Sequence, residues 1–220
     1  MLFLSYALNQ NTPTYGNRNQ FKIVKNSDID KGDVANDSFI STTVHIGTHI
    51  DMPYHFHKNG QTIDSFDADY WIFNAPLVVE ISPKSLIIKD ELIEILKGLN
   101  VKDTDILIVK TGICYDRGEQ VFWEKNYGLD PALYIYLLER LPSLRVIGFD
   151  SISISSFAHR LIGREAHKVF LNPEKPLLIL EDMDLRKVDK NTDFKRLIVS
   201  PLRIEECDGL PCTVFGELND

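Results

Sequence analysis

One short stretch of the chain holds four of its six histidines together with an aspartate: His45, His49, Asp51, His55 and His57. Many residues around them are β-branched, which predicts an extended segment rather than a helix. Because side chains alternate between the two faces of a strand, His45, His49 and Asp51 would share one face and apolar residues the other. Imidazole nitrogens and a carboxylate on one face are the ligands that a divalent cation needs.

The spacing of these donors limits how they could bind one cation. In a regular strand His45 and His49 would lie roughly 13 Å apart, at about 3.3 Å per residue, and two imidazoles hardly span that gap. Either the chain bends at Gly47, where a kink costs little, or two cations are bound. Asp51 is central in both cases, because a carboxylate can bridge two ions. A solvent-facing polar strand is the alternative, but scattered Ser, Thr or Lys would suit that role better.

Further ligands are expected from distant segments, as in most catalytic metal sites. Glu181 directly follows an apolar run at 177–180, so it would lie where a buried strand ends. Ordinary solvation at a strand end is the alternative for this acid. His159 and His167 are further candidates, and sequence spacing does not choose between them.

The size and composition of the chain favour a single soluble globular domain, residues 1–220. The chain has 220 residues, of which 44% are hydrophobic and 25% charged. Its net charge of −8 disfavours nucleic-acid and membrane partners, and no apolar run approaches a membrane span. Three cysteines without a C-x-x-C pair argue against a disulfide framework. We therefore expect a cytoplasmic protein that acts on a small molecule.

Strands dominate the predicted elements, with helices between them. The patterns predict helices at 90–97, 130–141 and 163–171, and strands at 2–7, 75–81, 105–110, 145–149, 177–180, 196–199 and 213–218. Polar residues 25–37 are interpreted as a connector, and the histidine strand is expected to begin at Ser38. This arrangement predicts an α/β or α+β fold with a mixed sheet.

Several blocks, in order along nearly the whole chain, resemble the cyclase family of metal-dependent hydrolases, which includes bacterial kynurenine formamidase. The most specific block is H-x-G-T-H-x-D-x-P-x-H, from His45 to His55. Supporting pieces are Leu4-Ser5, Thr12-Pro13, Gly148-x-Asp150, Gly163-Arg-Glu-Ala-His167 and Leu180-Glu181. The resemblance implies an α/β fold of the swivelling β/β/α type, with a mixed sheet and a few flanking helices.

The resemblance also assigns roles to individual residues. It implies that His45, His49 and Asp51 bind one ion and that Asp51, His167 and Glu181 complete a second. It makes His55 the proton donor and acceptor, and it leaves His57 and His159 without a ligand role. Tyr15 is placed in the substrate site, where similar formamidases have a tryptophan. The stretch from His167 to Glu181 is about two residues longer than the family pattern.

The expected activity is hydrolysis of an amide or formamide bond, as in arylformamidases, by metal-activated water with a histidine proton shuttle. Zinc is the first choice for the one or two divalent ions, and manganese or cobalt is also compatible with the ligands. One alternative is a mononuclear manganese or zinc enzyme that opens a cyclic amide such as isatin. Another is a non-catalytic metal-binding homologue. The resemblance further implies a homodimer or homotetramer.

Overall fold

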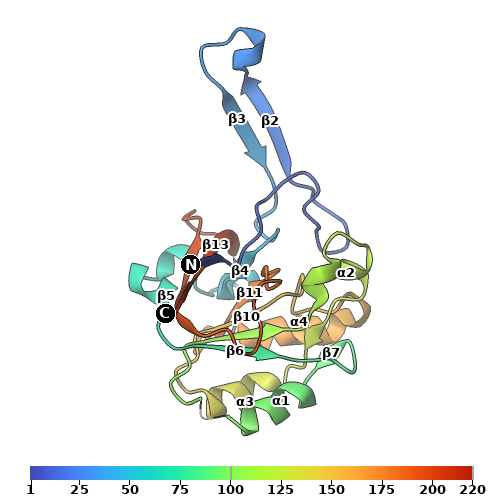
Figure 1. Cartoon of the computed structure of the whole chain (residues 1–220), viewed down its shortest axis with the longest axis vertical. Helices are drawn as coiled ribbons and strands as arrows, with labels where there is room; N and C mark the ends of the chain where they lie inside the picture. The colour runs from blue at the N-terminus through green and yellow to red at the C-terminus, as the bar shows by residue number, and fades with distance from the viewer. Residues whose placement is uncertain (100, 220) are drawn as a thin grey trace.

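A mixed sheet organises the molecule within residues 1–99 and 101–219, which the computed structural model describes. Its strand order is β5 (Ile72–Phe73), β12 (Phe194–Pro201), β13 (Gly209–Leu218), β4 (His49–Asp51), β11 (Leu178–Glu181), β10 (Val146–Phe149), β8 (Ile106–Lys110) and β6 (Pro76–Glu80). Strand β1 (Leu2–Phe3) also pairs with β13. The sheet therefore joins segments from both ends of the chain (Figure 1).

The sheet has a parallel half and an antiparallel half. Strands β6, β8, β10 and β11 run parallel, whereas β4, β13 and β12 join on through antiparallel pairs. Strand β8 is buried along its whole length, as expected for an apolar parallel strand covered on both faces. Contacts between β12 and β6 bring the two ends of the sheet together, so it is nearly closed.

Helices pack beside the parallel half of the sheet: α1 (Asp90–Lys97), α2 (Val121–Glu124), α3 (Leu133–Arg140) and α4 (Arg160–Phe170). Helices α1 and α3 lie side by side, and α3 also contacts α4 (Figure 1). Helix α1 buries Leu92 and Leu96 at a spacing of one turn, so its apolar face is turned to the core. No helix among the described residues is long and apolar enough to cross a membrane.

Short elements complete the described structure. Strands β7 (Ile87–Ile88) and β9 (Gly128–Leu129) form a small parallel pair. Short 3₁₀ helices lie at Ile29–Lys31, Pro53–His55, Ile63–Ser65, Ala68–Trp71, Ile113–Asp116 and Phe157–His159. Two of them matter for the site, because Pro53–His55 carries His55 and Phe157–His159 leads directly into α4.

The predicted α/β class with a mixed sheet is confirmed, and several elements match closely. The helix predicted at 90–97 is α1 with the same bounds. The strands predicted at 75–81, 105–110, 145–149 and 177–180 correspond to β6, β8, β10 and β11. Their continuous apolar sequences were enough to identify them, because buried parallel strands need no polar face.

Two predicted helices have different starting points. Helix α3 begins at Leu133 rather than at 130, after a turn in which the Asp130 side chain accepts a hydrogen bond from the Ala132 amide (2.8 Å). Helix α4 begins at Arg160 and runs through Gly163, which had been taken as its start. A Cβ on Gly163 would lie 1.8 Å from the Ser155 hydroxyl oxygen, so glycine allows α4 to approach this loop.

The prediction for the segment before the histidines is wrong. Residues 25–37 are not a connector but part of a hairpin, β2 (Lys22–Ser27) and β3 (Asp37–Ser41), that projects as an arm from the body (Figure 1). Its residues are almost all exposed, so its sequence lacks the alternation that marks a half-buried strand. The predicted histidine strand is also shorter than expected, since only His49–Asp51 forms β4. The strand predicted at 2–7 is limited to Leu2–Phe3.

Candidate metal-binding active site

Antiparallel pairing of β4 with β11 creates the centre of the candidate site. The register sets Glu181 on β11 opposite His49 on β4, and Asp51 shares a face of β4 with His49. His49 Nε2 lies 3.4 Å from Asp51 Oδ1 and 3.3 Å from Glu181 Oε2. All three side chains are buried, and their ligand atoms lie within 4.8 Å of one another. This register brings the histidine segment next to Glu181, which the sequence analysis proposed as a ligand from a distant segment.

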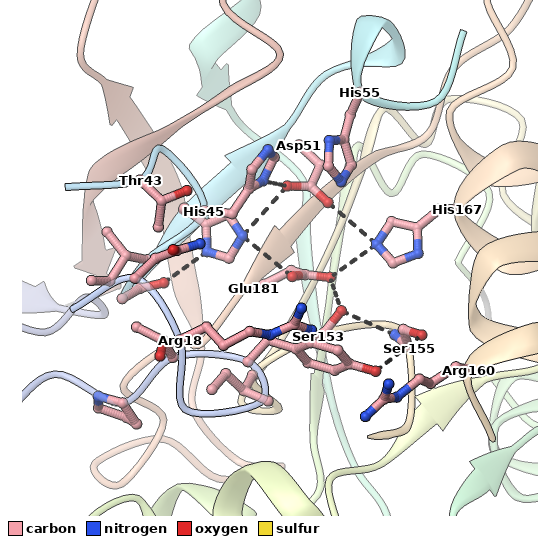
Figure 2. A pocket seen from close by; sticks show the side chains of 18 of the residues that line it. Arg18, Thr43, His45, Asp51, His55, Ser153, Ser155, Arg160, His167 and Glu181 are labelled. Carbon is pink, nitrogen blue, oxygen red and sulfur yellow. Dashed lines mark hydrogen bonds and ion pairs between the residues drawn. The ribbon is translucent and has the colours of Figure 1, made fainter. Parts of the chain in front are cut away.

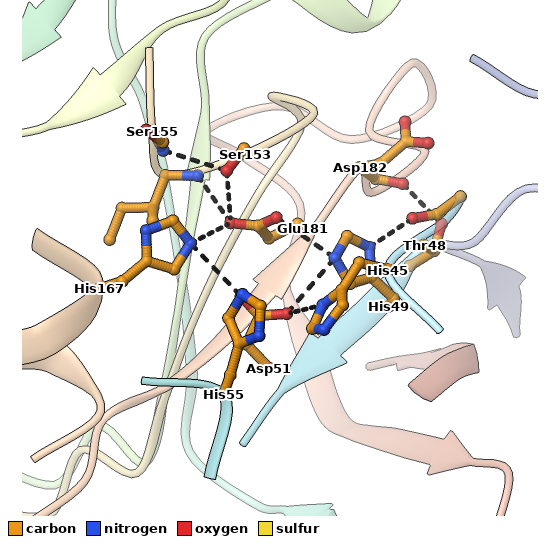
Figure 3. Close-up of polar contacts among 12 residues, drawn as sticks. His45, Thr48, His49, Asp51, His55, Ser153, Ser155, His167, Glu181 and Asp182 are labelled. Atoms are coloured by element: carbon orange, nitrogen blue, oxygen red, sulfur yellow. Dashed lines mark hydrogen bonds and ion pairs between the residues drawn. The ribbon is translucent and has the colours of Figure 1, made fainter. Parts of the chain in front are cut away.

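Helix α4 adds His167 to this group (Figure 3). Its Nε2 lies 3.5 Å from Asp51 Oδ2 and 3.8 Å from Glu181 Oε1. Glu181 is held from the other side, since its Oε1 accepts hydrogen bonds from the Ile154 amide (2.6 Å) and the Ser153 hydroxyl (3.3 Å). The loop that carries these donors therefore fixes the carboxylate against β4.

Backbone carbonyls decide which nitrogen of each buried histidine faces the carboxylates. His49 Nδ1 lies 2.8 Å from the carbonyl oxygen of Gly47, and His167 Nδ1 lies 2.8 Å from that of Gly163. A carbonyl only accepts, so both Nδ1 atoms carry a proton and each Nε2 offers a lone pair. Lone pairs directed at buried carboxylate oxygens require a cation or a proton between them. The donor set therefore fits a divalent cation.

In the absence of a metal ion, protons take this role. Burial disfavours the charged form of His49, but hydrogen bonds to Asp51 and Glu181 and the charges of these carboxylates raise its pKa well above the ordinary value. The pKa of His167 is also raised, because the same carboxylates outweigh burial. Burial would raise the pKa of Asp51, yet the charge of His45 and hydrogen bonds from the imidazoles hold it well below its usual range. Protons and a cation therefore compete for these ligands.

Gly47 provides a bend, which is one of the two alternatives that the spacing of the histidines left open. Its φ of +58° lies in the left-handed region, and a Cβ there would lie 2.3 Å from Leu8 Cδ2. The bend brings the His45 ring within 5.3 Å of the His49 ring, measured between centroids. His45 Nδ1 lies 2.7 Å from Asp51 Oδ1. Asp51 thus has His45 on one side and His167 on the other.

Asp208 is a functional candidate that the sequence reasoning missed. One of its carboxylate oxygens lies 2.8 Å from His45 Nε2 and 3.0 Å from His55 Nδ1. Hydrogen bonds from these imidazoles hold the pKa of Asp208 well below its usual range. In the sequence Asp208 precedes Gly209 and belongs to none of the patterns that indicated metal donors. The pairing of β13 with β4 brings it to the site, since the Met52 amide donates to the Asp208 carbonyl (3.0 Å).

His55 lies next to His45 at the edge of the group of metal donors. The two ring centroids are 4.0 Å apart, and donor atoms of His45, Asp51 and His55 lie within 4.8 Å of one another. The described residues thus contain two groups of three possible metal donors, and Asp51 belongs to both. The roles of His55 as proton shuttle and of His45 as ligand stay predictions.

His57 and His159, which were predicted to have no ligand role, lie apart from these groups. His57 Nε2 lies 2.8 Å from the carbonyl oxygen of Lys168. His159 ends a 3₁₀ helix with its side chain exposed. Sequence spacing alone does not distinguish His159 from His167, because both belong to one continuous helical segment.

A cavity of about 460 Å³ opens onto the donors (Figure 2). Tyr15 lines it, and its ring packs edge-on against Phe157 with centroids 5.5 Å apart, whereas its role in binding substrate stays a prediction. The Tyr15 hydroxyl lies 3.5 Å from that of Ser155. Three arginines, Arg18, Arg160 and Arg164, also line the cavity. The site therefore combines buried metal donors with an aromatic and cationic mouth that has room for a small molecule.

Known proteins are similar to this chain in sequence and in fold. Residues 2–156 match the family described as Putative cyclase. Kynurenine formamidase of Bacillus cereus is 25% identical over 209 residues, 94% of this chain and 92% of that protein. Kynurenine formamidase of Geobacillus thermodenitrificans is 28% identical over 174 residues, 78% of this chain and 75% of that protein.

A solved structure, isatin hydrolase A from Ralstonia solanacearum, superposes with a TM-score of 0.80 at 18% identity and covers 98% of this chain and 90% of its own. At that identity the likeness shows a shared fold. The family match extends over more than half of the chain and contains the whole histidine block. The resemblance found in the sequence is thereby confirmed, and the chain belongs to the Putative cyclase family.

Proposed function

We propose that this protein is a metal-dependent hydrolase of a carbon–nitrogen bond in a small amide or formamide. The observation that carries this proposal is the buried convergence of Asp51 and Glu181 with the Nε2 lone pairs of His49 and His167. Relatives that align along most of the chain are named kynurenine formamidases. The cavity beside these donors has the size of a small-molecule site.

The same side chains are proposed to hold the metal. His45, His49 and Asp51 would bind one ion, and Asp51 with His167 and Glu181 a second. Zinc is our first choice, with manganese and cobalt as alternatives, because nitrogen and carboxylate ligands suit all three. A divalent ion bound there lowers the pKa of water towards about 7 and polarises a carbonyl group.

His55 is proposed to move the proton. The Asp208 carboxylate can only accept, so His55 Nδ1 donates to it, and Nε2 is left free to take a proton and pass it to the leaving nitrogen. His55 lines the cavity beside the metal donors, where a substrate nitrogen would lie. Asp208 orients the ring, as outer-shell carboxylates do for histidines in metal sites.

Opening of a cyclic amide is the second candidate reaction. It is favoured by the shared fold with isatin hydrolase A and by the two groups of donors that share Asp51, since each has enough donors to hold one ion. A single ion would suit this reaction, whereas the formamidase proposal uses two. Metal content per chain separates the two candidates.

We also propose that the protein is a cytoplasmic homodimer or homotetramer in which a second copy covers the β2–β3 arm. An isolated hairpin is at best marginally stable in water. The arm nevertheless exposes about half of the side chains of Ile23, Val24, Phe39 and Ile40. Light scattering of wild-type protein and of Val24→Asp with Phe39→Asp tests this, with an oligomer expected for the former and a monomer for the latter. A monomeric wild type would contradict it.

Metal analysis followed by assay tests the hydrolase proposal. We expect one or two divalent ions per chain, and turnover of N-formylkynurenine or a simple aryl formamide that is lost with a chelator and restored by metal. His167→Asn should lose metal, whereas His159→Asn, a matched change at the exposed end of the same helical segment, should retain it. Fully loaded protein that turns over no formamide, cyclic amide or ester would overturn the proposal.

A further inference from the structure

The mouth of the cavity gathers arginines that form an ion pair with no carboxylate among the described residues. The chain has nine arginines. Those with acceptors within the described residues are Arg117, Arg140, Arg145, Arg186 and Arg196. Three of the other four, Arg18, Arg160 and Arg164, line the cavity that contains the metal donors. Within residues 1–99 and 101–219, no carboxylate lies within 4.0 Å of these three guanidinium groups.

Helical spacing connects two of these arginines with the metal donors. Arg160, Arg164 and His167 follow one another on α4 at intervals of four and three residues, so they share one face of the helix. His167 lies at the buried end of that face, and the arginines lie at the exposed end. Helix α4 thus extends from the metal donors to the mouth of the cavity.

The third arginine reaches the cavity from the loop that carries Tyr15. Figure 2 shows Arg18 and Arg160 on the opposite side of the view from His55. The Arg160 guanidinium stacks over the ring of Phe157, 4.0 Å from its centroid, and the same ring supports Tyr15. The Arg160 guanidinium and the Tyr15 ring therefore share one support, the ring of Phe157.

This local positive charge contrasts with the rest of the chain, whose net charge is −8. The two buried carboxylates do not offset it, because a divalent cation bound by Asp51 and Glu181 would balance both of their charges. A cleft of one sign concentrates ligands of the opposite sign, and guanidinium groups match the planar geometry of a carboxylate.

We propose that the substrate carries a carboxylate on the part that is not cleaved, and that Arg18, Arg160 and Arg164 bind it while the scissile bond lies at the metal donors. This inference rests on the proposed hydrolase function and narrows it to anionic aryl amides such as formamidobenzoates. Neutral substrates of the same size lack the group that the arginines bind.

Matched substrates test the proposal on the metal-loaded protein. The 2-, 3- and 4-formamidobenzoates are compared with the corresponding formamidobenzamides, which have the same shape without the charge. We expect kcat/KM to favour the best carboxylate over its amide by about 30-fold or more, since charge-assisted hydrogen bonds are the strong ones. Equal kcat/KM for the two series would overturn the proposal.

Variants show whether the arginines cause the preference. In Arg160→Gln with Arg164→Gln, we expect the ratio of kcat/KM between carboxylate and amide to fall to about threefold or less. Arg203→Gln is the matched control, because Arg203 is an exposed arginine outside the cavity, and it should keep the wild-type ratio. A preference that persists in the double variant would also overturn the proposal.

Binding to the metal-free protein separates this inference from the proposed function. Without metal, a carboxylate cannot gain affinity by coordinating an ion. Titration with 4-aminobenzoate and 4-aminobenzamide, followed by NMR, should show a preference for the anion in wild type that is lost in the double variant. If the loaded protein hydrolyses nothing but this preference is present, the hydrolase proposal fails while the anion site stands. If neither compound is preferred, the anion site is wrong.

Discussion

The inner and outer walls of the cavity differ in how firmly the fold holds their side chains. On the inner wall His49, Asp51 and Glu181 are buried on paired strands. On the outer wall Tyr15 and Arg18 belong to a loop, and Arg18 is exposed. Strand register fixes the inner donors relative to one another, whereas the outer side chains extend from a loop that belongs to no strand or helix. The reaction chemistry therefore depends on the rigid wall and the choice of substrate on the adaptable one.

The largest effect is expected from the inner wall. Asp51→Asn removes the carboxylate shared by both groups of metal donors, so it should abolish stoichiometric metal binding and lower kcat/KM by about 10³-fold or more. Metal content and turnover measure it. Asp69→Asn, at an exposed aspartate, should change neither. Retention of metal and activity in Asp51→Asn would show that the inner wall is not the active centre.

A change at His55 tests proton transfer on the inner wall separately from metal binding. His55→Ala should reduce kcat by roughly 10²–10⁴-fold, the usual contribution of general acid–base catalysis, with metal content unchanged. His159→Ala controls for loss of a histidine elsewhere. Loss of metal from His55→Ala would instead make His55 a ligand, as its place beside His45 and Asp51 permits.

The pH dependence of stability tests whether protons replace the cation on the inner wall. Burial disfavours the charged form of His45, but the charge of Asp51 and the hydrogen bond to Asp208 raise its pKa to about 9. A raised histidine pKa stabilises the folded state fully below about 6.5, and this stabilisation is lost as the pH rises through about 9. Metal-free protein should therefore lose on the order of 1–3 kcal/mol of unfolding free energy between these values.

Metal-loaded protein should show the opposite trend over the same pH range, because metal ligands must be deprotonated. Urea unfolding with chelator and with metal, at pH 6 to 9, measures both slopes. In the chelated protein, His45→Gln should flatten the decline. Parallel slopes with and without metal would contradict the exchange of protons for a cation.

Asp208 contacts both His45 on the inner wall and His55, the proposed proton shuttle. A substitution of Asp208 is expected to have a moderate effect on kcat. Asp208→Asn keeps the shape but weakens the hydrogen bonds to His45 and His55, and it should lower kcat by about 10-fold, as outer-shell changes do. KM should change less than kcat if the residue orients His55. Asp208→Glu should restore part of the activity. If Asp208→Asn changes only the thermal stability and not kcat, Asp208 has a structural role and does not orient His55.

The smallest effect is expected on the outer wall. Tyr15→Leu removes an aromatic face, so KM for aryl substrates should rise about threefold with little change in kcat. Tyr15→Phe retains the ring and loses only the contact with the Ser155 hydroxyl (3.5 Å), so its KM should stay close to that of wild type. A loss of kcat as large as that of His55→Ala would show that the two walls are not functionally distinct.

The sequence by itself determined the elements with strong local patterns. The apolar run of β8 and the amphipathic spacing of α1 were identified within a residue of their bounds, because hydrophobic periodicity depends only on neighbours along the chain. The histidine block also determined the family, since its residue types and spacing are specific and its match is confirmed. The β2–β3 arm was missed because a hairpin exposed on both faces leaves no such pattern.

Only the tertiary structure decided how distant residues meet at the site. His167 rather than His159 reaches Asp51 because α4 turns that face towards β4. Asp208 reaches His55 because β13 pairs with β4 across more than 150 positions of the chain. The chain bends at Gly47, and this bend brings the rings of His45 and His49 close together, which a flat strand would not do. Such contacts depend on strand register and helix packing, which local sequence patterns do not encode.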